Sequence, residues 1–340
     1  MKAIVLGGTG FLGMNVVTAL VAAGHDVTAT RRARSNTLFA RRLGSRLVSA
    51  DLDDTPSLTR AMKGCDVAFM CAGHYPRYSL DVERELSIAR KRVRASLEAA
   101  IDAGVRRYVL TSSVATIGRP RHGHALANEG DVLAHPPGVY HAVKLAIEDE
   151  VMRAHARGLD VVILCPSGVL GALDVKVGTG FLIVALGNGR LPFYVDGRIN
   201  VVDAEVVAHA HLAAAIHGTS GARYIVGGHN VTLHALLDIV ADELELPLRA
   251  VRLPGPIASL LATLDEMRCA TMNGSRRPML SRELVDVVRH GQWVSTERAS
   301  RELGLPEAPP LAATVRTACR WYGRHRYLPP AGGTHAEHHA

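Results

Sequence analysis

The chain has 340 residues, of which 48% are hydrophobic and 21% are charged, and its formal net charge is +7. This length and composition allow a substantial core, which excludes a peptide-sized binding module and a disordered protein. The positive charges are mostly arginines scattered along the chain, without aromatic interleaving or zinc-finger spacing, so no nucleic-acid partner is expected.

The first half of the sequence alternates short apolar runs with longer helical patterns. The expected strands are Lys2–Leu6, Asp26–Thr30, Arg46–Ala50, Asp66–Cys71, Arg107–Thr111 and Asp160–Cys165. The expected helices are Phe11–Ala23, Ser35–Leu43, Pro56–Met62, Leu80–Ala103 and Tyr140–Arg157. This alternation predicts an α/β fold with a doubly wound parallel Rossmann sheet. Continuous apolar strands fit burial on both faces.

After Pro166 the alternation weakens, and glycines surround one short helix at Phe181–Leu186. A strand near Asn200–Val202 and a helix over Asp203–Ile216 are expected to return to the main sheet, followed by a strand at Arg223–Val226. The remainder is expected to be a smaller, mainly helical C-terminal lobe. The predicted domains are a dinucleotide-binding domain (1–170, with 198–226 returning to it), a substrate-binding lobe (171–197 and 227–328) and a disordered tail (329–340).

The five cysteines are odd in number and have no C-x-x-C spacing, so neither a disulfide framework nor a metal site is expected. The tail histidines His335, His338 and His339 are likewise not assigned to a biological metal site. The N-terminal apolar run is too short for a signal peptide, and no stretch approaches the ~20 apolar residues of a membrane helix. We therefore expect a cytoplasmic protein that does not engage a membrane.

A glycine-rich segment joins the first strand to the first helix. The spacing of its glycines permits a tight turn and lets a pyrophosphate approach the backbone closely. The N-terminus of the helix that follows favours an anion. A glycine-rich turn without a ligand is the alternative. The expected contacts with the dinucleotide are Gly7, Thr9, Gly10, Phe11, Leu12 and Gly13.

Two arginines follow the second strand, where an NAD-binding protein would carry an acidic residue. Arg31 and Arg32 suit the 2′-phosphate of NADP(H), which accepts charge-assisted hydrogen bonds, so NADP(H) is favoured and NAD(H) remains possible. Exposed arginines at this position are also common without a ligand. Asp51 and Leu52, after the third strand, are placed near the adenine, although Asp51 could equally cap a helix.

A tyrosine and a lysine lie one helical turn apart at Tyr140 and Lys144. A neighbouring ammonium group favours a phenolate and brings the tyrosine pKa toward neutral pH, as acid–base catalysis requires. A third polar residue, Ser113, closes the fifth strand at the carboxyl edge where ligands of open α/β sheets bind. Ser113 is preferred to Ser112 because it is the last polar residue before Val114.

Taken together, these motifs resemble those of the extended short-chain dehydrogenase/reductase family, part of the NAD-dependent epimerase/dehydratase superfamily. The matching segments are Gly7–Gly13, Asp51–Leu52, Cys71–Gly73, Thr111–Gly118, Tyr140–Lys144 and Asn200–Ala208. Within the family, the chain is similar both to dihydroflavonol-reductase-type carbonyl reductases and to hopanoid-associated sugar epimerase homologues. It departs from many relatives at Ala89–Val93, where they carry N-V-x-G-T, and at Cys165, where they carry asparagine.

The resemblance implies that Tyr140 is the general acid/base, that Lys144 contacts the nicotinamide ribose and lowers the tyrosine pKa, and that Ser113 orients the substrate oxygen. It also implies a homodimer formed through the helix that bears Tyr140 and its neighbour. Further cofactor contacts are expected at Cys71, Ala72, Gly73, Pro166, Gly168 and Val169. Candidate substrate contacts are His74, Tyr75, Ser113 and Ser167, although His74 and Tyr75 could simply form a turn.

The sequence therefore predicts an enzyme that uses NADPH to reduce a ketone or aldehyde of a small molecule, or oxidises the corresponding alcohol. One alternative is an NAD-dependent nucleotide-sugar epimerase or dehydratase, which regenerates its cofactor. Another is a non-catalytic NADP-sensing regulator, which would need the glycine turn but not Ser113, Tyr140 and Lys144 together. The substrate lobe varies within such folds, so the substrate itself cannot be read from the sequence.

Overall fold

The structure, a computed structural model, describes residues 1–76, 79, 81–121, 125–271, 282, 285, 288 and 291–330. The predicted tail and its histidines lie outside the described residues from residue 331 onward. In the described part, no helix is both long enough and apolar enough to cross a bilayer.

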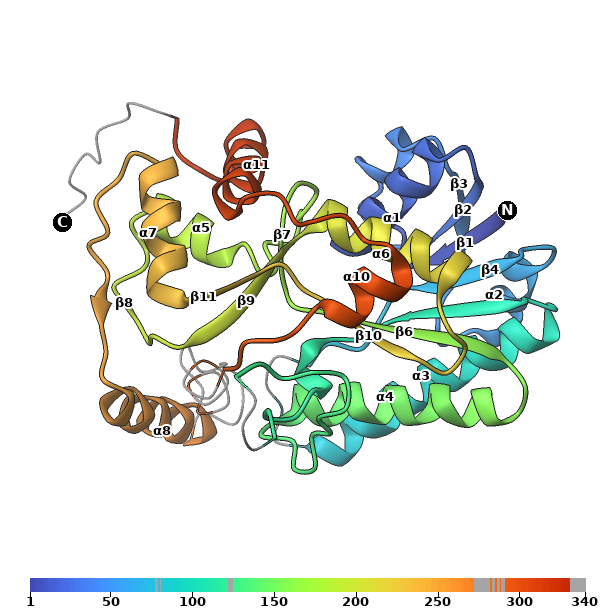
Figure 1. Cartoon of the computed structure of the whole chain (residues 1–340), viewed down its shortest axis with the longest axis horizontal. Helices are drawn as coiled ribbons and strands as arrows, with labels where there is room; N and C mark the ends of the chain where they lie inside the picture. The colour runs from blue at the N-terminus through green and yellow to red at the C-terminus, as the bar shows by residue number, and fades with distance from the viewer. Residues whose placement is uncertain are drawn as a thin grey trace.

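A parallel seven-stranded sheet forms the larger lobe of the described chain (Figure 1). Its strands, in spatial order, are β10 (Arg223–Val226), β6 (Asp160–Pro166), β5 (Arg107–Thr111), β4 (Val67–Met70), β1 (Lys2–Leu6), β2 (Asp26–Arg31) and β3 (Arg46–Ser49). The order reverses at β1, next to β4, and such a switch point opens a crevice at the carboxyl ends of the strands. The doubly wound Rossmann sheet is confirmed.

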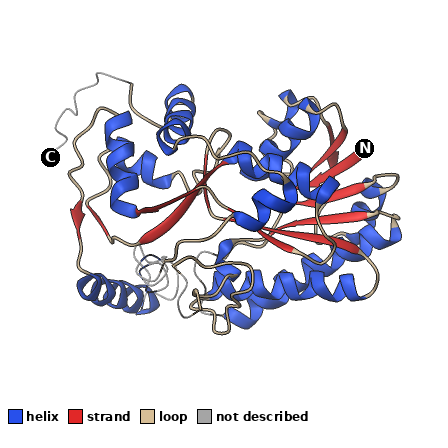
Figure 2. Cartoon of the chain, in the orientation of Figure 1, coloured by secondary structure: helices blue, strands red, loops and turns tan. Residues whose placement is uncertain are grey.

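Helices cover both faces of this sheet, as Figure 2 shows. On one face lie α2 (Thr55–Met62), α3 (Val82–Asp102) and α4 (Val139–Ala156), and on the other lie α1 (Phe11–Ala22), α6 (Ala204–His217) and α10 (Glu297–Leu303). Successive side chains of β1 enter alternate cores, with Ile4 and Leu6 on the α3 side and Ala3 and Val5 on the α1 side. Burial on both faces explains why the strands are continuously apolar.

A smaller lobe is built around short strands and the later helices. A three-stranded sheet has the order β11 (His229–Thr232), β9 (Arg198–Asp203) and β7 (Gly168–Leu170), and β8 (Phe193–Tyr194) pairs with β12 (Val251–Arg252). The helices of this part are α5 (Phe181–Gly187), α7 (Leu233–Glu243), α8 (Gly255–Thr271) and α11 (Leu311–Arg324). β7 begins two residues after β6 ends, so the chain passes directly from the main sheet into the smaller one.

Two predicted elements are wrong. The strand expected near Asn200 lies in the three-stranded sheet and not in the main sheet, because it pairs with β7 and β11; α6 and β10 do return to the main sheet. The helix expected over Ser35–Leu43 is only the 3₁₀ turn η1 (Ala40–Arg42). There the Asn36 side chain accepts a hydrogen bond from the Leu38 amide, which offers the backbone a turn in place of a helix.

Candidate functional site

The turn between β1 and α1 leaves no room for side chains. Gly7 has φ of +81°, and a Cβ added there would lie 2.8 Å from Ala72, the residue that follows β4 and Cys71. A Cβ on Gly13 would lie 2.2 Å from the Gly7 carbonyl oxygen. At its first residue the turn is anchored to β2, because the Gly7 amide donates to Thr30 Oγ1 at 3.0 Å.

The N-terminus of α1 is open to an anion. Its N-cap is Gly10, which makes no side-chain capping hydrogen bond to the free amides of the first turn, and that turn carries no acidic residue. Uncapped amides and the positive end of the helix dipole attract negative charge. The turn therefore fits a diphosphate, and Thr9, Gly10, Phe11 and Leu12 lie along the part that would face it.

The carboxyl ends of β2 and β3 carry the residues predicted to meet the adenosine. Arg31 is partly buried and Arg32 is exposed. Arg32 lies close enough to Asp53 to help lower its pKa, although hydrogen bonds from Arg92, the nearest at 2.7 Å, are the main cause. Asp51 accepts from the Asp53 amide at 3.1 Å.

The capping residue of α2 is Asp54, which accepts from the Ser57 amide at 3.2 Å. The alternative reading of Asp51 as the helix cap is therefore wrong. Leu52 is partly buried and packs against the core on the α3 face of the sheet.

The structure brings Ser113, Tyr140 and Lys144 together where β4 and β5 end. Tyr140 lies in the first turn of α4 and hydrogen-bonds with the Ser113 hydroxyl. Lys144 is buried one turn later, and its Nζ donates to the Thr111 carbonyl at 3.2 Å. A Cβ on Gly73 would lie 4.0 Å from that Nζ, so the ammonium group also faces the segment after β4.

The pKa of Tyr140 shifts in the direction opposite to the one predicted. Burial raises the pKa of the phenol, Tyr75 adds to the rise, and the hydrogen bond with Ser113 only partly opposes it. Burial also lowers the pKa of Lys144. The predicted direction of the net shift is wrong for this structure, because desolvation of the phenol is its largest cause. That Lys144 itself favours the phenolate stays a prediction.

Tyr75, another candidate substrate residue, also lies beside Tyr140. Its side chain is 62% exposed, and the centres of the Tyr75 and Tyr140 rings are 4.6 Å apart. His74 instead pairs with Glu85 of α3 through Nε2, and Arg92 lies 3.5 Å from its Nδ1. This pairing turns the imidazole toward α3.

The segment after β6 presents a polar atom without a protein partner. Ser167 Oγ is buried, and among the described residues it has no hydrogen-bond partner. Pro166 ends β6, while Gly168 and Val169 begin β7, so this segment links the two sheets. Cys71 is less available for chemistry, because burial raises the pKa of its thiol to about 12.

A buried polar cluster behind Ser113 was not predicted. Glu148, one turn beyond Lys144 on α4, accepts hydrogen bonds from the hydroxyls of Ser112 and Thr116 and lies 3.2 Å from Arg223 Nε. The cluster therefore holds the backbone on both sides of Ser113. It also explains why Ser112 is not free to act on a substrate. The i, i+4 spacing from Lys144 to Glu148 was the available signal.

A second buried residue, His211 of α6, was also missed. Its Nδ1 lies 2.7 Å from the Val207 carbonyl, so this nitrogen carries the proton, and Nε2 then accepts from Thr111 Oγ1 at 2.7 Å. Burial lowers the pKa of His211 to about 4. A neutral imidazole thus supports the end of β5 from the opposite face of the sheet. His211 is one of three histidines in this apolar helix, and no local pattern marked it as the buried one.

Comparison with known proteins assigns the family. A family model described as the NAD dependent epimerase/dehydratase family matches residues 3–227, from β1 through β10. The chain belongs to this family. It is an NAD(P)-dependent oxidoreductase of the extended short-chain dehydrogenase/reductase type, as the sequence predicted, and its relatives include reductases and dehydrogenases.

Three proteins similar to this family member each cover nearly its whole length. A putative dihydroflavonol 4-reductase of Synechocystis sp. is 31% identical over 95% of each chain. A solved nucleoside-diphosphate-sugar epimerase from Pseudomonas aeruginosa is 29% identical, covers 97% of this chain and 99% of its own, and has a TM-score of 0.81. A dTDP-glucose 4,6-dehydratase from Streptomyces venezuelae, solved with NAD, has a TM-score of 0.75, covers 96% of this chain and 98% of its own, and shares the fold at 20% identity.

Proposed function

We propose that the protein reduces a ketone or aldehyde of a small organic substrate, with NADPH as the hydride donor and Tyr140 as the general acid. The observation that carries this proposal is the juxtaposition of Ser113, Tyr140 and Lys144 at the carboxyl edge of the sheet. A purely nucleotide-sensing protein has no need of this arrangement. The chain's relatives named as a dihydroflavonol reductase and a ketoreductase favour the same reaction.

In this mechanism the protein binds, orients and protonates. The Ser113 hydroxyl and the Tyr140 phenol would both hydrogen-bond to the substrate oxygen, which fixes the carbonyl carbon for attack. The bound nicotinamide supplies the hydride. Tyr140 then donates its proton to the oxygen as negative charge develops there. The raised pKa of Tyr140 keeps the phenol protonated before the reaction, as a general acid requires.

The dinucleotide would lie across the carboxyl edge of the sheet. Its diphosphate would rest on the turn from Gly7 to Gly13, and Lys144 would contact the nicotinamide ribose. The segment from Pro166 to Val169, with Ser167 and Gly168 between them, would lie against the nicotinamide. The buried Ser167 hydroxyl has no hydrogen-bond partner in the described part of the chain. Cys71, Ala72 and Gly73 would line the middle of the site.

We infer a preference for NADP(H) from Arg31 and Arg32, because guanidinium groups match a 2′-phosphate. The test is a titration of the protein with NADPH and NADH, followed by fluorescence. We expect the Arg31→Ala/Arg32→Ala variant to bind NADPH about tenfold to a hundredfold more weakly, with NADH binding unchanged. Tighter binding of NADH by the wild type would overturn the inferred preference.

The test of the reaction is turnover of a panel of ketones and aldehydes, followed by NADPH oxidation. We expect Tyr140→Phe to lower turnover by about 10² to 10⁴-fold while NADPH binding is kept. Tyr327→Phe is the matched control, because it also removes a tyrosine hydroxyl, one that donates to the Val175 carbonyl in the smaller lobe. Normal turnover by Tyr140→Phe would refute the role of the phenol.

One other function has a specific observation in its favour. The likeness to the nucleoside-diphosphate-sugar epimerase extends over almost the entire chain. An epimerase or dehydratase would retain NAD tightly through purification and would consume no NADPH overall, so the same turnover assay separates the two.

We also propose that residues 171–197 and 227–328 form the substrate-binding lobe, with two changes from the sequence prediction. The strands β7 and β9 belong to this lobe because they pair with β11, and α10 belongs to the dinucleotide domain because it packs on α6 and β10. A homodimer through α4 and its neighbour α3 would follow the family pattern. Light scattering on the purified protein would decide between a dimer and a monomer.

A further inference from the structure

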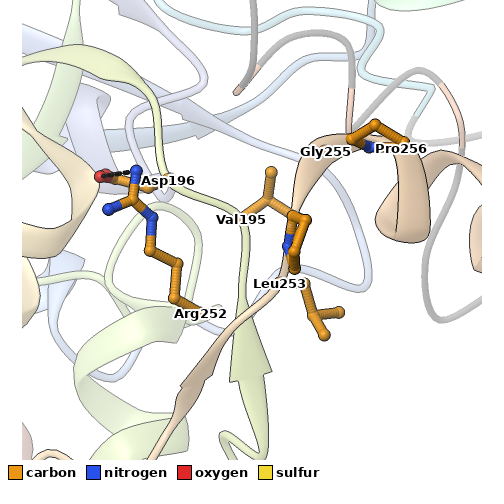
Figure 3. A pocket seen from close by; sticks show the side chains of 7 residues that line it. Val195, Asp196, Arg252, Leu253, Gly255 and Pro256 are labelled. Carbon is orange, nitrogen blue, oxygen red and sulfur yellow. Dashed lines mark ion pairs between the residues drawn. The ribbon is translucent and has the colours of Figure 1, made fainter.

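A cavity rich in arginine lies beside the loop that follows Ser113. It has a volume of about 470 Å³, and its walls come from this loop, from the start of β9 and from residues 291–293. Its described lining includes three arginines, Arg119, Arg198 and Arg252, and one carboxylate, Asp196. A smaller hollow of about 210 Å³ shares Asp196 and Arg252 with this cavity and reaches the start of α8 (Figure 3).

The carboxylate of Asp196 pairs with one of the three arginines, Arg252. Asp196 Oδ1 accepts from the amides of Gly197, at 2.9 Å, and His234, at 3.0 Å. Its Oδ2 pairs with Arg252 at 3.3 Å, as the dashed line in Figure 3 marks. Among the described residues, no carboxylate forms an ion pair with Arg119 or Arg198. Within the part of the chain that the structure describes, the cavity thus presents two guanidinium groups, those of Arg119 and Arg198, that are in no ion pair.

The walls of the cavity are held in place. The Arg198 guanidinium lies 4.8 Å from the centre of the Trp293 ring, and Trp293 Nε1 donates to the Val231 carbonyl at 3.0 Å. Gln292 Nε2 donates to the carbonyl of Ile117 at 2.9 Å. These contacts connect the cavity to the segment that begins at Ser113. An arginine held on an aromatic ring loses less freedom when it binds an anion.

We propose that this cavity is a substrate subsite that binds a carboxylate or phosphate group. The inference rests on the proposed function, because the same substrate must reach Tyr140. Arg119 lies six residues after Ser113, so their Cα atoms are within about 20 Å of each other. The substrate class is therefore an elongated carbonyl compound with an anionic group at the end remote from the carbonyl. Planar guanidinium groups match the paired oxygens of either anion.

A tryptophan beside the site allows a binding assay that needs no turnover. The chain has two tryptophans, so Trp321→Phe leaves Trp293 as the single fluorophore. This protein is titrated with 4-phenylbutyrate, with phenyl phosphate, and with neutral 4-phenylbutyramide at constant ionic strength. We expect saturable binding of at least one anion and none of the amide. Binding of 4-phenylbutyrate would show that the cavity accepts a carboxylate, and binding of phenyl phosphate that it accepts a phosphate.

The variants then test the arginines. Arg119→Gln/Arg198→Gln should weaken anion binding by about tenfold to a hundredfold. Arg249→Gln, an exposed arginine that does not line the cavity, is the matched control and should leave binding unchanged. Circular dichroism checks that each variant folds.

Equal binding of acid and amide, absence of saturable binding, or equal affinities in the double variant and the control would each overturn the proposal. A failure of the proposed function would give a different result. Tyr140→Phe would then turn over normally in the NADPH assay, while the fluorescence titration of the cavity would be unaffected.

Discussion

Removal of Glu148 should destabilise the fold through the buried cluster that it organises. The Glu148 side chain is 8% exposed and that of Arg223 is 19% exposed, so Glu148→Ala would leave a largely buried cation without its carboxylate and the Ser112 hydroxyl without its acceptor. The Thr116 hydroxyl would keep the Ser113 carbonyl as an acceptor. Breaking a buried ion pair costs about 3–5 kcal/mol. Because Arg223 also donates to Thr116 at 2.8 Å and is partly solvated, we expect the lower end, about 3 kcal/mol.

Urea unfolding of a double-mutant cycle measures this coupling. The cycle comprises Glu148→Ala, Arg223→Met and the two together, and the double variant should lose about 1–3 kcal/mol less than the sum of the single losses. Glu148→Gln is the matched control, since its amide oxygen still accepts from the hydroxyls, and it should cost less than Glu148→Ala. Additivity of the two single losses to within about 0.5 kcal/mol would refute the reasoning.

Two further predictions concern the cofactor turn and acid stability. Gly13→Ala should weaken NADPH binding at least about tenfold, because its Cβ would lie 2.2 Å from the Gly7 carbonyl oxygen. Gly323→Ala is the control and should leave NADPH binding unchanged, because a Cβ there would meet open space. Equal affinities of the two variants for NADPH would contradict the close packing of the turn. Burial holds the pKa of His211 near 4, below the 6.5 of an exposed histidine. As the pH drops, His211 is therefore protonated in the unfolded chain before it is protonated in the folded one, and the free energy of unfolding falls between pH 6.5 and pH 4. Over that window wild type should lose about 3 kcal/mol more than His211→Gln in urea unfolding, and parallel pH profiles would count against a neutral buried imidazole.

The parts of the fold that sequence reasoning predicted depend on local patterns. The glycine turn and the strands of the main sheet follow from residue spacing and from continuous apolar runs, which act within a few residues. Tyr140 and Lys144 could be paired because they are four residues apart, which is one turn of a helix. Ser113 could be placed because it follows the end of a predicted strand. These local rules were sufficient to bring the three residues to one edge of the sheet.

The errors come from effects that depend on the tertiary structure. The strand at Asn200 has the composition of a main-sheet strand, and only its pairing with β7 and β11 places it in the smaller lobe. The pKa of Tyr140 depends on desolvation by the folded protein, which a spacing rule does not contain. The partners of Glu148 are Ser112, Thr116 and Arg223, and Arg223 lies 75 residues away in sequence, so no local pattern joins it to the helix.

A crystal structure with bound NADP⁺ would test the catalytic assignment most directly. We predict that the diphosphate contacts the amides of the turn between Gly7 and Gly13, and that the nicotinamide ring lies beside the Tyr140 phenol and the Ser113 hydroxyl, with Lys144 on its ribose. A nicotinamide bound away from Tyr140, or a phenol turned out of the crevice in the complex, would contradict the assignment.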